Sequence, residues 1–343
     1  MTYQVQKTLP PATEVLTKLP ITNEIGARVK QDRQEISDIL TGKDSRKLLI
    51  VGPCSAWPSD AVIEYYEKLK PIAEKVADKI KIVGRVYIQK PRTTVGWTGP
   101  LNQPDPGAPA DMESGIYYCR EMMIRVLELG FALADEALFT HNDGYFVDLL
   151  SWVAIGARST EDQEHRVFAS MIPHPVGLKN PTSGNMQIAV NSIVSAQHPH
   201  VFALHRNQIE TSGNPLAHLI LRGGKGKSNF SEKKILRAVE LMDKANIENP
   251  AVIVDASHEN SINPETGKKD PLLQPRVISE VLDLTEKNSD IANAIKGFMV
   301  ESFIEDGGQS FAPEGLKYGC SITDPCLGIE KTEKMIMEIA ERL

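Results

Sequence analysis

Cysteine is scarce in this chain of 343 residues, which contains four cysteines and no Cys-x-x-Cys pair. So few thiols at irregular spacing cannot form a disulfide framework, and they also lack the spacing of a zinc-ribbon site. Each cysteine is therefore expected to be either a core residue or an individual ligand. The four are Cys54, Cys119, Cys320 and Cys326.

An excess of positive charge is also missing, because 38 lysines and arginines face 45 acidic residues and leave a net charge of -7. A protein that binds nucleic acid needs a basic face, and here the lysines are scattered among acids. The composition therefore excludes a nucleic-acid partner. Any site for an anion has to be local.

No apolar run approaches the roughly 20 residues that span a membrane. The first seven residues lack the apolar core of a secretory signal. The sequence therefore predicts a cytoplasmic protein without a membrane partner. With 41% hydrophobic and 24% charged residues, the chain can bury a large core, either as one α/β barrel or as two medium domains.

Residues 1–45 stand outside the pattern of the rest of the chain. Pro10 and Pro11 interrupt any helix, and residues 23–40 then read as one amphipathic helix with an apolar stripe that includes Ile25, Val29 and Ile36. We expect this stripe to remain exposed on an N-terminal arm. An exposed stripe of that size normally meets a partner, which predicts a homodimer or homotetramer.

Residues 46–343 alternate strand-like and helical patterns, which is typical of βαβ units around a parallel sheet. Eight such strands predict a closed (β/α)8 TIM barrel as the catalytic unit. An additional pair, 201–204 and 208–211, predicts a β-hairpin inserted before the sixth barrel strand. The barrel strands are expected at 48–52, 82–84, 131–134, 153–156, 175–178, 219–221, 251–254 and 297–300, with helices at 60–76, 114–129, 185–195, 231–245 and 274–285.

The carboxyl ends of these strands carry a cationic set of side chains. Two arginines, a lysine and two threonines occur within residues 85–94, and Pro91 favours an extended backbone at Lys90. Taken alone, such a run could be a solvated basic turn. Because strand ends of a barrel share one face, however, further cations join it there and could hold more than one phosphate or carboxylate. The cationic set is Arg85, Lys90, Arg92, Arg158, Lys179 and Arg222.

A second set at the strand ends mixes a thiol, an imidazole and carboxylates. Singly, each residue has an ordinary explanation as a small core residue, a hydrogen-bonded histidine or a surface acid. Their coincidence at one barrel mouth instead predicts a site for a borderline divalent metal ion such as Mn, Fe, Co or Zn. The set consists of Cys54, His258, Glu301 and Asp324.

Six motifs together resemble one family. They are Gly52-Pro53-Cys54-Ser55, Lys90-Pro91-Arg92-Thr93-Thr94-Val95-Gly96-Trp97, Gly156-Ala157-Arg158-Ser159-Thr160-Glu161, Leu221-Arg222-Gly223-Gly224, Ser257-His258 and Ser321-Ile322-Thr323-Asp324. From about Asn23 to its end the chain is similar to the type I 3-deoxy-D-arabino-heptulosonate 7-phosphate (DAHP) synthases. The resemblance implies a transferase that condenses phosphoenolpyruvate with erythrose 4-phosphate and water to give DAHP and phosphate, the first step of the shikimate pathway of aromatic amino acid biosynthesis.

The resemblance also implies roles for individual residues. Cys54, His258, Glu301 and Asp324 would be ligands of a divalent metal that polarises the aldehyde as a Lewis acid. Lys90 is the expected proton donor to the nascent alkoxide, directly or through metal-bound water. The expected catalytic set is Lys90, His258 and Cys54. Phosphoenolpyruvate would be held by Arg85, Lys90, Arg158, Lys179 and Arg222, and the aldose phosphate by Arg92 with Thr93. The expected substrate-binding set is Arg85, Lys90, Pro91, Arg92, Thr93, Glu136, Ala157, Arg158, Lys179, Arg222 and Asp324.

Three segments depart from the family pattern. The loop 259–271 is longer than usual, and Pro181 stands where glycine is expected. Segment 139–144 and the hairpin near Arg206 match poorly the regions that form the feedback site of regulated members, which predicts weak or absent inhibition by phenylalanine, tyrosine or tryptophan. A different pocket on the same surfaces could use Phe139, His141, His205 and Arg206.

Two other functions remain open at this point. The first is condensation of phosphoenolpyruvate with a different aldose phosphate, as in 3-deoxy-octulosonate 8-phosphate synthases, although the intact Lys90-Pro91-Arg92-Thr93 argues against it. The second is a catalytically silent barrel that acts as a regulatory subunit, which the presence of all four candidate metal ligands disfavours.

Overall fold

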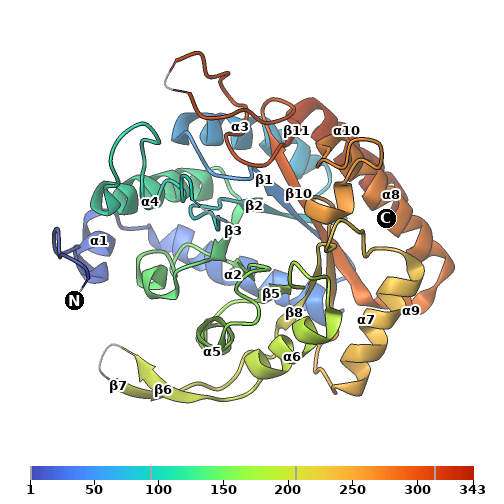
Figure 1. The fold of residues 1–343 in the computed structure, drawn as a ribbon. Helices are drawn as coiled ribbons and strands as arrows, with labels where there is room; N and C mark the ends of the chain where they lie inside the picture. The colour runs from blue at the N-terminus through green and yellow to red at the C-terminus, as the bar shows by residue number, and fades with distance from the viewer. Residues whose placement is uncertain (1, 93–94, 205–206, 313) are drawn as a thin grey trace.

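Eight parallel strands close into a ring in the computed structural model, which describes residues 2–92, 95–204, 207–312 and 314–343 (Figure 1). The order is β1-β2-β3-β4-β5-β8-β9-β10, and β1 also pairs with β10. This arrangement confirms the predicted TIM barrel. The strands are β1 Lys47–Gly52, β2 Ile80–Arg85, β3 Ala132–Ala137, β4 Trp152–Ile155, β5 Val176–Lys179, β8 Ala217–Leu221, β9 Val252–Asp255 and β10 Ile295–Phe303, with the short β11 Leu327–Gly328 beside β10.

Helices follow the strands and cover the outside of the ring, each with its apolar side inward. In α3, for example, Tyr65, Tyr66 and Leu69 are fully buried. None of the helices in the described part of the chain is long and apolar enough to cross a membrane. The helices are α3 Ser59–Lys75, α4 Met112–Glu128, α5 Gln163–Met171, α6 Met186–Gln197, α7 Glu232–Lys244, α8 Gln274–Lys287, α9 Ser289–Ala294 and α10 Ile329–Arg342, with short 3₁₀ turns η1 Thr140–Tyr145, η2 His258–Ser261 and η3 Pro271–Leu273.

The predicted N-terminal helix is present as α2 (Asn23–Thr41) and runs across the ring of strands (Figure 1). Its residues Ile36 and Ile39 are fully buried and belong to one apolar cluster with Leu48 of β1. The helix therefore closes the N-terminal end of the barrel. The expectation that its stripe stays exposed for a partner is wrong, because the open end of the barrel offers the same chain an apolar surface to cover. The homodimer or homotetramer remains a prediction without this support.

A short helix, α1 (Ala12–Lys18), precedes α2 and was not expected from the sequence. It begins directly after Pro11, whose extended backbone ends the preceding segment. The two prolines therefore set the start of a helix instead of excluding one, since proline is tolerated at a helix N-terminus.

The hairpin is confirmed as β6 (Val201–Leu204) and β7 (Asn207–Glu210), which pair antiparallel before β8. Residues His205 and Arg206 lie outside the described residues.

Five barrel strands extend further at their C-terminal ends than expected: β2, β3, β5, β9 and β10. β3 includes Asp135 and Glu136, and β10 includes Glu301, which pairs in register with Gly52. From the sequence, each of these strands is expected to end just before a charged residue. Backbone pairing continues past that point because hydrogen bonds between strands do not depend on the side chain. The side chains of Glu136 and Glu301 lie at the barrel mouth.

Candidate active site

The C-terminal ends of the strands surround a cavity of about 610 Å³. It collects almost all of the predicted substrate-binding residues from separate strands, while Thr93 lies outside the described residues. Lys269, Glu259, Thr182, Thr323 and Val95 also line the cavity and were not expected there. The predicted residues in its wall are Arg85, Lys90, Pro91, Arg92, Glu136, Ala157, Arg158, Lys179, Arg222, His258 and Asp324.

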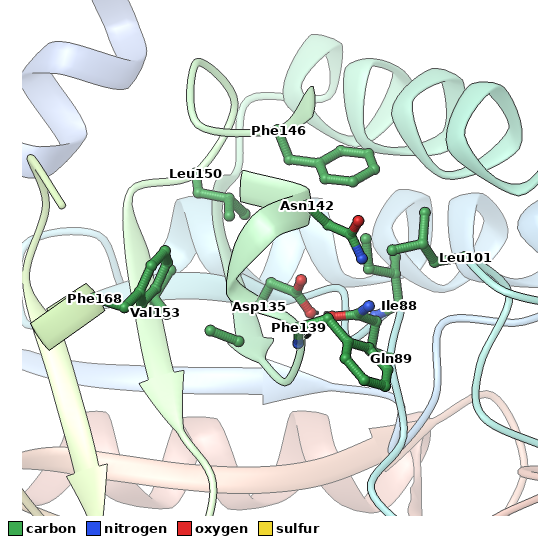
Figure 2. A pocket seen from close by; sticks show the side chains of 11 residues that line it. Ile88, Gln89, Leu101, Asp135, Phe139, Asn142, Phe146, Leu150, Val153 and Phe168 are labelled. Atoms are coloured by element: carbon green, nitrogen blue, oxygen red, sulfur yellow. Dashed lines mark hydrogen bonds between the residues drawn. The ribbon is translucent and has the colours of Figure 1, made fainter. Parts of the chain in front are cut away.

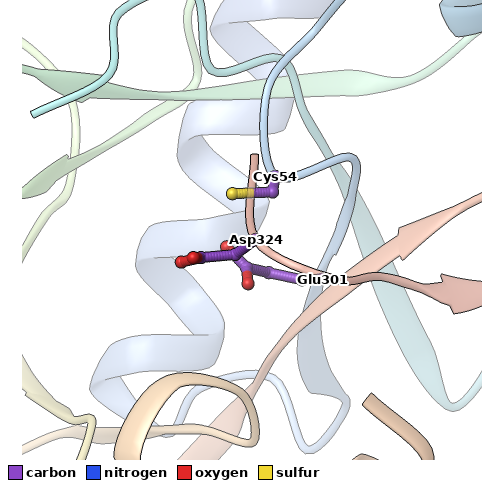
Figure 3. A group of neighbouring side chains, drawn as sticks. All are labelled: Cys54, Glu301 and Asp324. Atoms are coloured by element: carbon purple, nitrogen blue, oxygen red, sulfur yellow. The ribbon is translucent and has the colours of Figure 1, made fainter. Parts of the chain in front are cut away.

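Three of the four predicted metal ligands converge at this mouth (Figure 3). One ligand atom each of Cys54, Glu301 and Asp324 lies within 4.8 Å of the others. Cys54 follows β1, Glu301 lies in β10, and Asp324 precedes β11. One sulfur and two carboxylate donors fit a borderline divalent cation, so the residues present suit the metal that the sequence predicts.

The thiol of Cys54 lies beside an ammonium group. Lys90 donates from Nζ to the Cys54 sulfur at 3.0 Å and to the Cys54 carbonyl oxygen at 2.7 Å. Burial raises the pKa of the Cys54 thiol and Glu301 raises it further, whereas Lys90 opposes both. Lys90 is itself buried, and its contact with sulfur holds the ammonium at the centre of the mouth.

The carboxylate of Glu301 is held from two sides. Arg85 donates from Nη2 to Oε1 at 2.7 Å, and the hydroxyl of Ser257 donates to Oε2 at 2.7 Å. The guanidinium carbon of Arg85 lies 3.7 Å from the centre of the Tyr87 ring. Burial by itself would raise the pKa of Glu301, but Arg85 and the other nearby positive charges together outweigh it and hold that pKa well below its usual value. Glu301 is therefore ionised, as a metal ligand has to be.

The fourth predicted ligand, His258, lines the same cavity but is not one of the three converging residues among those described. Its Nδ1 lies 2.8 Å from Oδ2 of Asp255, and its φ of 53° is left-handed. Burial lowers the pKa of His258 despite the nearby Asp255, and this shift favours the neutral ring. Metal-binding histidines usually place their second ring nitrogen against a carboxylate. Asp255 therefore has an orienting position that the sequence analysis did not assign, and metal binding by His258 remains a prediction.

Two other cations in the cavity wall differ in their partners: Lys179 forms an ion pair, whereas Arg222 has open hydrogen-bond donors. Lys179 donates from Nζ to Oε2 of Glu136 at 2.5 Å, and both side chains are buried. Burial would raise the pKa of Glu136, yet Lys179, together with Lys90 and Arg85, lowers it to about 2. In contrast, Nε and Nη1 of the buried Arg222 find no hydrogen-bond partner among the described residues. A buried guanidinium with open donors is a receptor for an anion.

Three buried asparagines fix the loops that carry these cations. Asn180 accepts the backbone N–H of Arg222 at 2.9 Å, and Asn229 donates to the same oxygen of Asn180 at 2.9 Å. Asn260 in turn accepts the backbone N–H of Asn229 at 2.9 Å. The network joins the segments after β5, β8 and β9. The sequence analysis did not find it, although asparagine directly beside Lys179 was a usable signal.

Arg92, like Arg158, differs from the four buried cations of the set because its side chain is exposed. A Cβ added at Gly96 would lie 3.0 Å from Nε of Arg92. Glycine at this point of the motif therefore lets the guanidinium lie close against the backbone.

A second, much smaller cavity of about 30 Å³ lies behind β3 and η1 (Figure 2). Phe139, Phe146 and Phe168 line it together with polar Gln89 and Asp135. Burial raises the pKa of Asp135 to about 7. A space of this size accommodates water and not an amino acid. Weak or absent feedback inhibition remains a prediction, since part of the surfaces concerned lies outside the described residues.

Comparison with known proteins gives a consistent result. Residues 18–337 match the DAHP synthetase I family. The phospho-2-dehydro-3-deoxyheptonate aldolase of Corynebacterium glutamicum is 38% identical over 97% of this chain and 91% of its own length. The Tyr-sensitive enzyme of that name from Escherichia coli is 39% identical over 94% of this chain and 90% of its own.

A solved structure shows the same likeness in three dimensions. The phospho-2-dehydro-3-deoxyheptonate aldolase of Francisella tularensis superposes with a TM-score of 0.93 at 35% identity, covering 99% of this chain and 98% of that one. Sequence, fold and the residues around the barrel mouth agree. The chain therefore belongs to the DAHP synthetase I family.

Proposed function

We propose that this protein condenses phosphoenolpyruvate with erythrose 4-phosphate and water to give DAHP and phosphate. The observation that carries the proposal is the combination, within one barrel mouth, of the Cys54, Glu301 and Asp324 donors with a wall of cations. Membership of the family supports the reaction. A cytoplasmic location and a homo-oligomer are part of the proposal as predictions.

Cys54, Glu301 and Asp324 would hold the divalent metal, with His258 as a fourth ligand through the ring nitrogen that Asp255 leaves open. A bound metal supplies a Lewis acid that polarises the aldehyde of the sugar. Mn, Fe, Co and Zn all accept this mixture of donors.

The cations would hold phosphoenolpyruvate, which carries both a phosphate and a carboxylate. Arg222 offers two open donors, and Lys179 lies in the same wall. Their charges are fixed before the ligand arrives, because Asn180 holds the backbone of Arg222 and Glu136 holds the ammonium of Lys179. Preformed positive charge favours a bound anion without a cost in reorganisation. Arg158 and Arg85 complete this set as predicted.

The proposed reaction needs one proton and one water. The methylene carbon of phosphoenolpyruvate forms a bond to the aldehyde carbon, and the aldehyde oxygen becomes an alkoxide that takes a proton from Lys90. Water adds to the former enol carbon and loses a proton. The bond from that carbon to the phosphate oxygen then breaks and releases phosphate. Lys90 is suited to the first proton transfer because its ammonium lies 3.0 Å from the Cys54 sulfur, beside the proposed metal site.

Arg92 would hold the phosphate of the sugar at the rim, together with Thr93. Its exposure suits a ligand that binds at the edge of the cavity. A phosphate site at Arg92 distinguishes erythrose 4-phosphate from longer aldose phosphates only by the distance between the aldehyde and the phosphate of the sugar. The acceptor sugar is therefore tested directly.

The test measures phosphate released from phosphoenolpyruvate across a panel of aldose phosphates. We expect the highest kcat/KM with erythrose 4-phosphate, no turnover after chelation, and recovery with Mn, Fe or Co. His258→Ala is expected to abolish activity at every metal concentration. If another aldose phosphate were preferred, that sugar would be the acceptor in place of erythrose 4-phosphate. Full turnover in metal-free enzyme would contradict the proposed metal requirement. No release with any sugar would indicate a silent barrel.

A further inference from the structure

Lys269 lies in the long connection between β9 and α8, which the sequence marks as unusual. This connection folds back on itself. The backbone N–H of Gly267 donates to the carbonyl oxygen of Asn263 at 2.8 Å. The backbone N–H of Asp270 donates to the carbonyl oxygen of Ser261 at 2.9 Å. Ile262 and Lys269 thereby form an antiparallel bridge. The backbone of Lys269 is held in place at the rim of the cavity.

From this position the ammonium of Lys269 contacts Oδ2 of Asp324, 55 positions later in the chain. Each of the three converging donors therefore has one cation: Lys90 for Cys54, Arg85 for Glu301, and Lys269 for Asp324. These cations balance a group of acidic side chains that would otherwise repel one another.

The three pairs differ in exposure. The side chains of Arg85 and Glu301 are 1% and 0% exposed, whereas those of Lys269 and Asp324 are 27% and 40% exposed. Ion pairs open to solvent are weak and exchange readily. The contact of Lys269 with Asp324 is therefore the one that an arriving ion can break most easily.

A divalent ion and an ammonium group cannot share one carboxylate without mutual repulsion. We propose that Lys269 is a placeholder cation: it holds Asp324 while no metal is bound, competes with the metal for that carboxylate, and is released into the substrate cavity when the metal binds. This inference rests on the proposed function, since it takes Asp324 as a metal ligand. Lys269 is in this sense a positioning residue.

The test is a calorimetric titration with Mn²⁺ alone, without substrates, so that turnover plays no part. Lys269→Met removes the competing charge and is expected to bind Mn²⁺ about three- to tenfold more tightly than the wild type. Lys269→Arg retains the cation and should restore the wild-type affinity. Lys268→Met is the matched control, because Lys268 is the exposed neighbour, and its affinity should equal that of the wild type.

The outcomes separate this proposal from the one on which it rests. Equal or weaker Mn²⁺ binding by Lys269→Met would overturn the placeholder role and leave the synthase function standing. No Mn²⁺ binding by any variant would reject the metal site and this inference together. Added salt screens the ion pair, so the difference between wild type and Lys269→Met should shrink as the NaCl concentration rises. A difference that persists unchanged in high salt would also contradict competition by charge.

Discussion

The two ends of the barrel use the same eight strands in opposite ways. At the N-terminal end, α2 covers the strands with apolar side chains such as Ile36 and Ile39. At the C-terminal end, buried Arg85, Glu136 and Lys179 line an open cavity. Because all barrel strands are parallel, every N-terminus lies at one end and every C-terminus at the other. We therefore expect that folding stability and catalytic activity can be altered separately. Three substitutions and one change of pH test this separation.

The largest effect is expected at the C-terminal end from Lys90→Met. Loss of the proposed proton donor should reduce kcat by roughly 10²- to 10⁴-fold, which is the usual contribution of general acid catalysis. The side chain of methionine fills a similar volume, so the fold should persist. Steady-state kinetics measure the first effect and circular dichroism the second. A kcat within about twofold of the wild type would remove Lys90 from the reaction.

The N-terminal end should show the reverse effect in Ile36→Ala. This side chain is fully buried beneath the barrel, and truncating a buried isoleucine to alanine costs about 2–5 kcal/mol of folding free energy. We expect a lower thermal midpoint with unchanged kcat in the protein that remains folded. Lys30→Ala, on the exposed side of α2, is the control and should change neither. A fall in kcat without loss of stability would mean that the two ends are coupled.

A smaller effect within the mouth is expected from Arg92→Ala. Removing an exposed guanidinium at the rim should raise the KM for erythrose 4-phosphate about tenfold or more and leave the KM for phosphoenolpyruvate near its wild-type value. Initial rates with one substrate varied at a time distinguish the two. If only the KM for phosphoenolpyruvate rose, the division of the cationic set between the two substrates would be incorrect.

Acid should weaken the two ends over different pH ranges. Burial lowers the pKa of His174 to about 3 and of His218 to about 4, from an ordinary value of 6.5, and both lie near the N-terminal ends of strands. The unfolded chain therefore binds protons that the folded chain does not, so stability falls as pH drops below about 6.5, by up to about 1.4 kcal/mol per pH unit for each histidine.

At the mouth, stability also falls as the pH falls, but it does so over a lower pH range. The pKa of Glu136 is lowered from 4.5 to about 2, so its stabilisation is lost only below about pH 4.5. Between pH 7.5 and 5, thermal unfolding reports these histidines together with Asp135, whose pKa of about 7 acts in the opposite direction. His218→Gln keeps an acceptor for the indole N–H of Trp152 and should flatten this part of the profile. A profile that stays equally steep in this variant would exclude His218 as a cause.

The sequence by itself determined the barrel and the kinds of side chain at its mouth. Apolar runs that alternate with helical patterns are local, and they placed all eight strands. Since strand ends of a barrel share one face, the sequence predicted that Cys54, Glu301 and Asp324 lie close together although they are far apart in the chain. The motif that begins at Lys90 also indicated the family from sequence alone.

Only the tertiary structure decided which side chains meet. The stripe of α2 could have faced a partner or its own barrel, and periodicity cannot distinguish the two because both bury the same residues. Strand lengths at Glu136 and Glu301 depended on backbone pairing, and the contact of His258 with Asp255 depended on a left-handed turn. Lys269 reaches Asp324 because the connection between β9 and α8 folds back on itself. Partners of charged groups are set by long-range geometry, which no local pattern records.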